Sequence, residues 1–146
     1  MWRNKMIEKI KAIIDDKIPL VSNLSNVSAI LNEMEDINWC GFYLAKDETL
    51  YLGPFQGEVA CTTIPFGKGV CGTAAQTKKT LIVDNVLEFK GHIACSSKSR
   101  SEIVTPIIKG DTVVGVIDID SPSFSRFNKD DQDLLEEVAR NLAILF

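Results

Sequence analysis

Apolar residues recur at helical spacing in the first part of the chain, and this pattern predicts two helices before any strand. Four isoleucines fall on one face of a segment from about residue 3 to residue 15. Pro19 then interrupts the pattern. A second periodic segment follows, with its apolar stripe at Leu20, Leu24, Val27, Leu31 and Met34. Two roles stay open for these helices: they cover a sheet, or they form the interface of a homodimer.

From Trp39 onwards the pattern becomes that of short strands separated by polar turns. A later segment, EIVTPIIKGDTVVGVIDIDS, is typical of a hairpin that turns at KGD. Pro106 lies inside the first strand of this hairpin and argues against a central position for it. The segment GKGVCGTAAQT is rich in glycine and small residues and predicts a turn into a short helix. Four further segments have the composition of strands: WCGFYLA, LYLGPF, VACTTIPF and TLIVDN.

The last 20 or so residues predict a C-terminal helix. Asn128 is a plausible N-cap, and the acids of the first turn suit the helix dipole. The order of elements predicts an α+β domain, with a central antiparallel sheet of about six strands and the N-terminal and C-terminal helices packed on one face. We assign residues 1–36 to the N-terminal helices, 37–127 to the sheet and active-site loops, and 128–146 to the C-terminal helix of a single domain.

Composition and charge narrow the classes of function. The chain has 146 residues and a formal net charge of −4, which argues against nucleic acid as a partner. It has no polybasic segment for a membrane surface and no apolar run near the ~18 residues of a membrane span. The N-terminal segment mixes charges into its apolar residues, unlike a secretory signal. We therefore expect a cytoplasmic protein, a compartment in which structural disulfides are rare.

The predicted hairpin gathers three acids. Side chains alternate between the faces of a strand, so Asp118 and Asp120 share one face at the end of an apolar run. Antiparallel pairing through the KGD turn places Glu102 beside them. The end of the strand is exposed to water, or the acids form a pocket wall that binds a cation or donates a proton. Because like charges repel, the cluster requires an ammonium group, a metal or a proton. No loop has the spacing of an ion-binding motif, so we assign no metal ligands.

Four cysteines and a single histidine complete the candidate chemistry. None of the cysteines forms a C-x-x-C pair, which disfavours a zinc site of the usual spacing. They are small buried hydrophobes, or some of them are reactive thiols. Cys95 lies in the loop that leads into Glu102, and Cys61 and Cys71 flank a glycine-containing segment that gives Cys95 two alternative disulfide partners. We interpret Cys40 as a packing residue and expect His92 to order its loop.

At this point the residues identify a family. The chain resembles the free methionine-(R)-sulfoxide reductases, stand-alone proteins with the GAF fold. The matching segments are NWCGFYL, LGPFQGEVACTTIPFGKGVCGTAA, DNVLEFKGHIACSSKSRSEIVTPI and GVIDIDSPSFSRF, which cover most of the chain from Asn38 to Phe127. The motifs GPFQG, GVCGTA, GHIAC and SEIV, in this order, distinguish this family from a generic GAF domain.

The resemblance implies roles for eight residues. Cys95 matches the attacking cysteine of the family, and Cys71 and Cys61 match two cysteines of which one or both act in resolution. The acids Glu102, Asp118 and Asp120 match acids of the family's substrate pocket. Trp39 and Tyr43 match aromatic residues that line the same pocket.

The resemblance also implies a reaction and its partners. The Cys95 thiolate attacks the sulfoxide sulfur of free methionine sulfoxide, one of the acids protonates the departing oxygen, and a sulfenic acid results. A second cysteine converts it to a disulfide, which thioredoxin reduces with electrons from NADPH. No bound cofactor is needed. Two rival interpretations remain: a GAF module that senses a nucleotide or a pigment without catalysis, and a structural or dimerisation domain with buried cysteines.

Overall fold

A twisted antiparallel sheet lies at the centre of the computed structural model, which describes residues 2–92 and 98–146. In these residues the sheet has six strands in the order β3-β2-β1-β6-β5-β4. All neighbouring pairs are antiparallel. The strands are β1 (Trp39–Lys46), β2 (Thr49–Gln56), β3 (Thr63–Pro65), β4 (Leu81–Val83), β5 (Ser101–Lys109) and β6 (Thr112–Ser121). The structure therefore confirms the predicted α+β class and the hairpin of β5 and β6.

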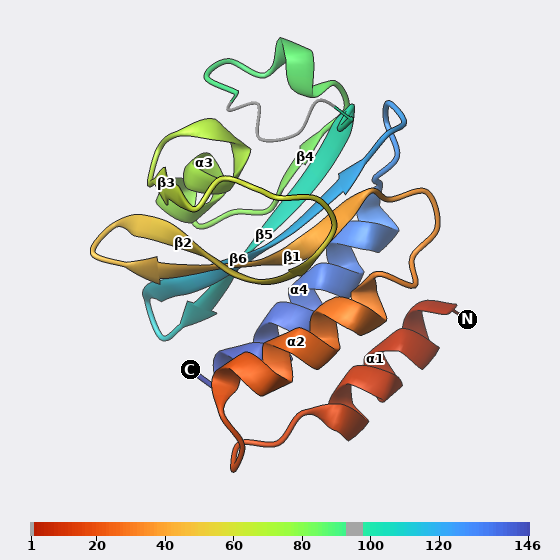
Figure 1. The fold of residues 1–146 in the computed structure, drawn as a ribbon, viewed down its shortest axis with the longest axis vertical. Helices are drawn as coiled ribbons and strands as arrows, with labels where there is room; N and C mark the ends of the chain where they lie inside the picture. Colours follow the sequence, from red (N-terminus) through yellow and green to blue (C-terminus); the bar gives the residue numbers. More distant parts are fainter. Residues whose placement is uncertain (1, 93–97) are drawn as a thin grey trace.

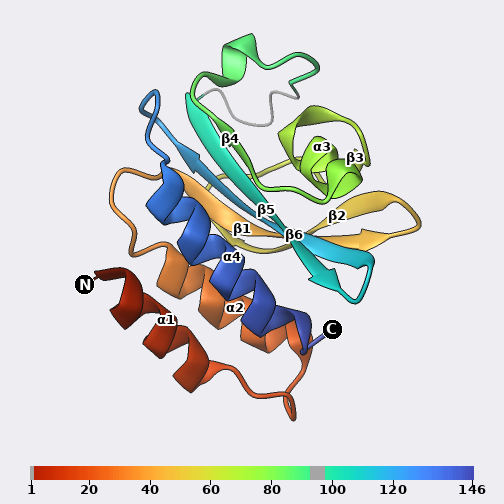
Figure 2. The same cartoon turned by 180° about the vertical axis from the view of Figure 1, so that it is seen from behind.

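Helices cover both faces of this sheet. On one face α2 and α4 pack directly on the strands, and α1 packs on α2 and α4 as an outer layer (Figure 1, Figure 2). The short helix α3 lies on the opposite face. Their bounds are α1 (Trp2–Ile13), α2 (Leu20–Leu31), α3 (Gly69–Thr77) and α4 (Lys129–Ala143). The prediction that terminal helices share one face is confirmed, although α1 reaches the sheet only through α2 and α4.

Two hydrophobic clusters occupy the two faces of the sheet, and β1 shows how the sequence separates them. Cys40 and Phe42 point toward the helical layer and join the cluster of α1, α2 and α4. Trp39 and Tyr43 point to the other face and join the cluster around α3. This alternation follows from the two-residue period of a strand. The first face provides the main core, and the second face is left for a pocket.

Two predicted strands are shorter in the structure. The segment 59–66 pairs with the sheet only as β3, and TLIVDN pairs only as β4. Residues 58–61 instead cross the pocket face, where the Tyr43 hydroxyl donates a hydrogen bond to the Cys61 carbonyl oxygen at 2.9 Å. The short β4 also explains Pro106. The β4–β5 ladder ends at Val104, so Pro106 lies beyond the strand that would otherwise flank it.

A close contact at Gly72 fixes α3 against the sheet edge. A Cβ atom at this position would lie 2.4 Å from the Pro65 carbonyl oxygen, a distance that real side chains do not adopt. The Gly67 amide also donates to the Gly72 carbonyl oxygen at 2.8 Å. Because only glycine permits this approach, the GVCGT motif brings the neighbouring Cys71 down onto the second face of the sheet.

The C-terminal helix begins as predicted. The Asn128 side chain accepts hydrogen bonds from the amides of Asp130 and Asp131, and the Asp131 carboxylate accepts one from the Asn128 amide. This reciprocal capping box satisfies amides that otherwise lack partners at a helix start. It fixes the helix that packs against the sheet behind the pocket strands.

Candidate active site

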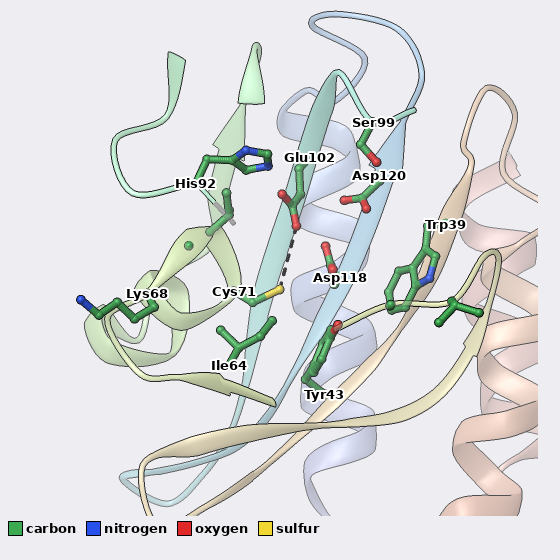
Figure 3. Close-up of a pocket in the computed structure, with 14 residues that line it drawn as sticks. Trp39, Tyr43, Ile64, Lys68, Cys71, His92, Ser99, Glu102, Asp118 and Asp120 are labelled. Atoms are coloured by element: carbon green, nitrogen blue, oxygen red, sulfur yellow. Dashed lines mark hydrogen bonds between the residues drawn. The ribbon is translucent and has the colours of Figure 1, made fainter. Parts of the chain in front are cut away.

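Three carboxyl groups meet on the pocket face of β5 and β6. Glu102 pairs directly with Asp120, and Asp118 pairs with Val104, two residues further along β5. Glu102 and Asp118 are 8% and 6% exposed. Figure 3 shows the three side chains pointing into the same space. The convergence predicted from the KGD hairpin is confirmed, and the alternative of a fully wet strand end is wrong, because two of the acids are buried.

Burial and mutual repulsion govern the charge of this acid cluster, which consists of Glu102, Asp118 and Asp120. Loss of water contact raises the pKa of each carboxyl group, those of Glu102 and Asp120 well above the usual range. The negative charge of Asp118 raises the pKa of both neighbours further. Among the described residues, buried Oδ1 atoms of Asp118 and Asp120 have no hydrogen-bond partner. The cluster therefore holds protons or attracts a cation.

Cys71 faces the acid cluster from the first turn of α3. Its thiol donates a long hydrogen bond to Glu102, with 3.9 Å between Sγ and Oε2 (Figure 3). Burial, followed by the charges of Asp118 and Glu102, raises the pKa of the thiol well above its usual value. A helix start favours an anion, but here desolvation and the carboxylates outweigh it. Cys71 is therefore a neutral thiol in the empty pocket.

Two aromatic side chains of β1 form the opposite wall. The Tyr43 hydroxyl donates to the Cys61 carbonyl oxygen, and the Trp39 indole donates to the Glu58 carbonyl oxygen at 3.0 Å. The indole also stacks on Phe55, with 5.1 Å between ring centroids. Each ring thus anchors one end of segment 58–61 over the pocket. The polar atoms of the rings are satisfied by this segment, and their apolar surfaces face the cavity.

These walls line a small cavity that is partly open to solvent. Six of its lining residues are charged, sulfur-containing or aromatic residues that the sequence predicted: Trp39, Tyr43, Cys71, Glu102, Asp118 and Asp120. Cys61 is disulfide-bonded, whereas Cys40 and Cys71 are free thiols. The predicted attacking residue, Cys95, lies outside the described residues. His92 also lines the cavity, and partial burial lowers its pKa, so it adds no fixed positive charge.

Comparison with known proteins shows the family to which the chain is related. The model of the GAF domain family matches residues 26–146. The free methionine-R-sulfoxide reductase of Escherichia coli is 46% identical over 132 residues, which cover 90% of this chain and 80% of the relative. The Saccharomyces cerevisiae protein of the same name is 46% identical over 145 residues, with 93% and 81% covered.

A solved structure agrees with these relatives. It is the free methionine-R-sulfoxide reductase of Neisseria meningitidis in complex with its substrate, which matches with a TM-score of 0.94 at 41% identity. The match covers 99% of this chain and 87% of that one. The chain belongs to the free methionine-R-sulfoxide reductase family of GAF domains. A purely structural role for the chain is therefore disfavoured, since the named relatives are reductases and one of them was solved with its substrate.

Sequence reasoning missed part of the pocket of this family member. Ser99 is 7% exposed and lines the pocket, where its hydroxyl accepts a hydrogen bond from the side-chain amide of Asn38 at 3.3 Å. Ile64 and Lys68 also line it, from β3 and the residue before α3. Ser99 precedes β5 by two positions, so its place beside the acids follows from strand pairing. No local sequence pattern predicts that Ile64 or Lys68 lines the pocket.

Cys40 behaves as predicted. It is fully buried on the helical face, away from the pocket, and its thiol donates to the Ser28 carbonyl oxygen at 3.3 Å. Burial, with a smaller contribution from Asp118 and Asp120, raises the pKa of the thiol to about 12. Cys40 is therefore a packing residue and a suitable control for the pocket cysteines.

In the part of the chain that the structure describes, no helix has the length and apolar character to span a membrane.

The raised pKa values of the acid cluster predict an unusual pH dependence of stability. A carboxyl group whose pKa is higher in the folded state destabilises the fold as pH rises from its unfolded pKa toward its folded pKa. Asp118→Asn removes one such group and relieves repulsion on the other two. We expect it to raise the free energy of unfolding at pH 8 by about 1 kcal/mol or more, since one pKa unit corresponds to about 1.4 kcal/mol.

Urea unfolding of the reduced, ligand-free protein at pH 8 and pH 4.5 measures this effect. The gain should shrink at pH 4.5, because pH 4.5 lies close to the unfolded-state pKa of about 4, where the raised folded-state pKa values cost the fold little. Glu8→Gln, at an exposed position on α1, is the matched control and should change little at either pH. An Asp118→Asn protein less stable than wild type at pH 8 contradicts the assignment.

Proposed function

We propose that this protein reduces free L-methionine (R)-S-oxide to L-methionine in the cytoplasm, with thioredoxin as the reductant. The observation that carries the proposal is a buried cluster of three acids with unpaired oxygens, beside a buried thiol, in a pocket of a chain from this family. The named relatives and the substrate complex support the choice of substrate. The preference for the R epimer rests on those relatives.

The acid cluster offers a physical reason for selecting the free amino acid. A free methionine sulfoxide carries an α-ammonium group, which a residue inside a peptide lacks. Transfer of this ammonium into the pocket would supply the cation that the unpaired oxygens of Asp118 and Asp120 require. A peptide would leave buried carboxyl groups without a partner, and sites of this kind strongly reject analogues that lack the pairing group.

The chemistry proceeds in three balanced steps. The Cys95 thiolate attacks the sulfoxide sulfur, one proton is consumed at the oxygen, and the oxygen ends on Cys95, so that the step yields methionine and the Cys95 sulfenic acid. A second thiol then attacks the sulfenic sulfur, which forms a disulfide and releases water. Thioredoxin exchanges its dithiol for this disulfide and leaves oxidised. An acid whose pKa is raised, as in the cluster, holds the proton that the first step consumes.

Cys61 is the better candidate for the second thiol. It takes part in a disulfide and directly follows Val59 and Ala60, which line the pocket. Cys71 is a free thiol at the base of the pocket, where burial and the three carboxylates of the acid cluster oppose formation of the thiolate. Because thiol exchange needs the thiolate, Cys71 is the slower nucleophile. We assign Cys61 as the resolving residue and Cys71 as part of the pocket base.

A coupled assay tests the reaction. With thioredoxin, thioredoxin reductase and NADPH, the purified protein should oxidise NADPH when free methionine sulfoxide is added and consume only the R epimer of a racemic mixture. Cys95→Ser should abolish turnover, whereas Cys40→Ala, which changes a buried thiol outside the pocket, should retain it. A fully active Cys95→Ser protein contradicts the mechanism, and a colourless inactive protein that binds a nucleotide favours the sensing interpretation.

The ammonium requirement is tested by masking the charge. Acetylation of the amino group of methionine sulfoxide should lower kcat/KM by about 10- to 100-fold, the loss expected when a hydrogen bond to a charged group worth about 1.5–3 kcal/mol is removed. Asp118→Asn should lower kcat/KM for the free substrate. It should therefore reduce the ratio of kcat/KM for free methionine sulfoxide to kcat/KM for the acetylated form. Equal kcat/KM values for both substrates in the wild-type protein would exclude a role for the acids in selection.

The order of the thiols is tested by two substitutions. Cys61→Ser should allow one rapid turnover, with one methionine released per chain, and then stall as the sulfenic acid. Cys71→Ser should continue through many turnovers with thioredoxin. Mass spectrometry of the stalled Cys61→Ser protein, after trapping with a sulfenic-acid reagent, locates the oxidised sulfur. Sustained turnover by Cys61→Ser together with a stalled Cys71→Ser would reverse the assignment.

A further inference from the structure

One thiol and two carboxyl groups converge at the base of the pocket from three different elements. Cys71 comes from α3, Glu102 from β5 and Asp118 from β6. One donor atom of each, a sulfur and two carboxylate oxygens, lies within 4.8 Å of both others. All three residues are buried. The three positions are 31 and 16 residues apart in sequence, which is why no motif spacing predicted them as a set.

Asp118 gives independent evidence that this group receives a ligand. The residue is 6% exposed, and its Oδ1 atom is buried without a hydrogen-bond partner among the described residues. Figure 3 shows its carboxyl group directed into the pocket, between Cys71 and Asp120. A buried carboxyl oxygen without a partner is costly unless a proton or a cation satisfies it.

We propose that Cys71, Glu102 and Asp118 form a binding site for a single zinc ion. Bond lengths of about 2.0–2.3 Å place the donors of a tetrahedral zinc site about 3.3–3.7 Å apart. The Sγ–Oε2 distance is already 3.9 Å, and the remaining separations close by about 1.5 Å or less. The thiol distinguishes zinc from magnesium and calcium, which take oxygen ligands.

Binding is an exchange of protons for the metal. The Cys71 S–H bond breaks as the Zn–S bond forms, and the proton leaves to solvent together with the protons of any protonated carboxyl group. No oxidant or reductant takes part. Because zinc ligands must be deprotonated, protons compete with the metal for the three side chains. Affinity therefore rises with pH and falls in acid.

Three protein ligands leave the fourth position of the ion open, as in exchangeable zinc sites. The ion lies where the acid cluster faces the cavity, so it occupies the place that the substrate ammonium would take. Zinc and free methionine sulfoxide should therefore exclude one another, an expectation that rests on the proposed function. The site would act as a reversible inhibitory site that also shields Cys71 from oxidation.

Titration with Co²⁺ alone tests the site directly, because a thiolate bound to Co²⁺ has a charge-transfer band in the near ultraviolet. The reduced Cys61→Ser/Cys95→Ser protein retains only two cysteines, Cys71 in the pocket and Cys40 in the helical core. It should show the band at neutral pH, lose it on acidification and lose it on addition of Zn²⁺, which displaces the cobalt. Adding Cys40→Ala to this background is the matched control and should leave the band intact.

Adding Cys71→Ser to the same background should remove the band and weaken Zn²⁺ binding by more than about tenfold, a loss that even outer-shell substitutions cause at metal sites. Glu102→Gln retains the thiol and should weaken Zn²⁺ binding to a similar extent, with circular dichroism as the check of folding. A band that persists without Cys71, or no band in its presence, overturns the proposal.

A second measurement separates this inference from the proposed reaction. Zn²⁺ should raise KM for methionine sulfoxide in the wild-type protein without lowering kcat, and chelation should restore the original value. A protein that shows the cobalt band but no reductase activity retains the metal site and refutes the proposed function. A protein with activity but no band refutes the metal site alone.

Discussion

The site depends on one constraint: three carboxyl groups are held in a buried space that cannot neutralise them. The β5–β6 ladder fixes Glu102 opposite Asp120 and brings Asp118 to the same face. Burial removes water from the carboxyl groups, and their mutual repulsion adds to that cost. Protons bound to the acids offset this cost, and a bound cation would offset it in the same way. The proposed selection of an ammonium-bearing substrate, supply of a proton and affinity for zinc would all result from this electrostatic cost.

The fold can tolerate this repulsion because the main hydrophobic core and the acid cluster lie on opposite faces of the sheet. Residues that face the helical layer, such as Phe42 and Ile117, are fully buried in the main core. Their neighbours one position along each strand face the pocket. Strand alternation therefore lets a single β-hairpin contribute apolar packing on one side and ionisable groups on the other. Fixing these groups on central strands rather than loops keeps them close together despite their repulsion.

The cysteines differ in chemistry because their surroundings differ. Cys40 is one residue from Trp39, yet it points into the helical core and serves only packing. Cys71 is placed among carboxyl groups by the close approach of α3 at Gly72. Cys61 lies in segment 58–61, which the Tyr43 hydroxyl holds through a carbonyl oxygen. Desolvation and charge make the Cys71 thiol a poor nucleophile and, once deprotonated by a metal, a good ligand.

The sequence by itself determined the α+β class, the helix start at Asn128 and the meeting of Glu102 with Asp118 and Asp120. These follow from local periodicity, capping chemistry and a single hairpin, in which partners are near in sequence. The motifs also identified the family and the pocket residues Trp39 and Tyr43. Segment 59–66, by contrast, has the composition of a strand, but most of it lies outside the sheet. Tyr43 binds its backbone at Cys61, and Trp39 binds the backbone of Glu58 just before it.

Only the tertiary structure decided that Cys71 contacts Glu102, that Ile64 lines the pocket, and that an oxygen of Asp118 stays unpaired. Each of these facts depends on the packing of α3 and β3 against strands distant in sequence. Periodicity records which face a side chain occupies, but not what approaches that face from another part of the chain. For the same reason, the donor set of Cys71, Glu102 and Asp118 has no sequence signature.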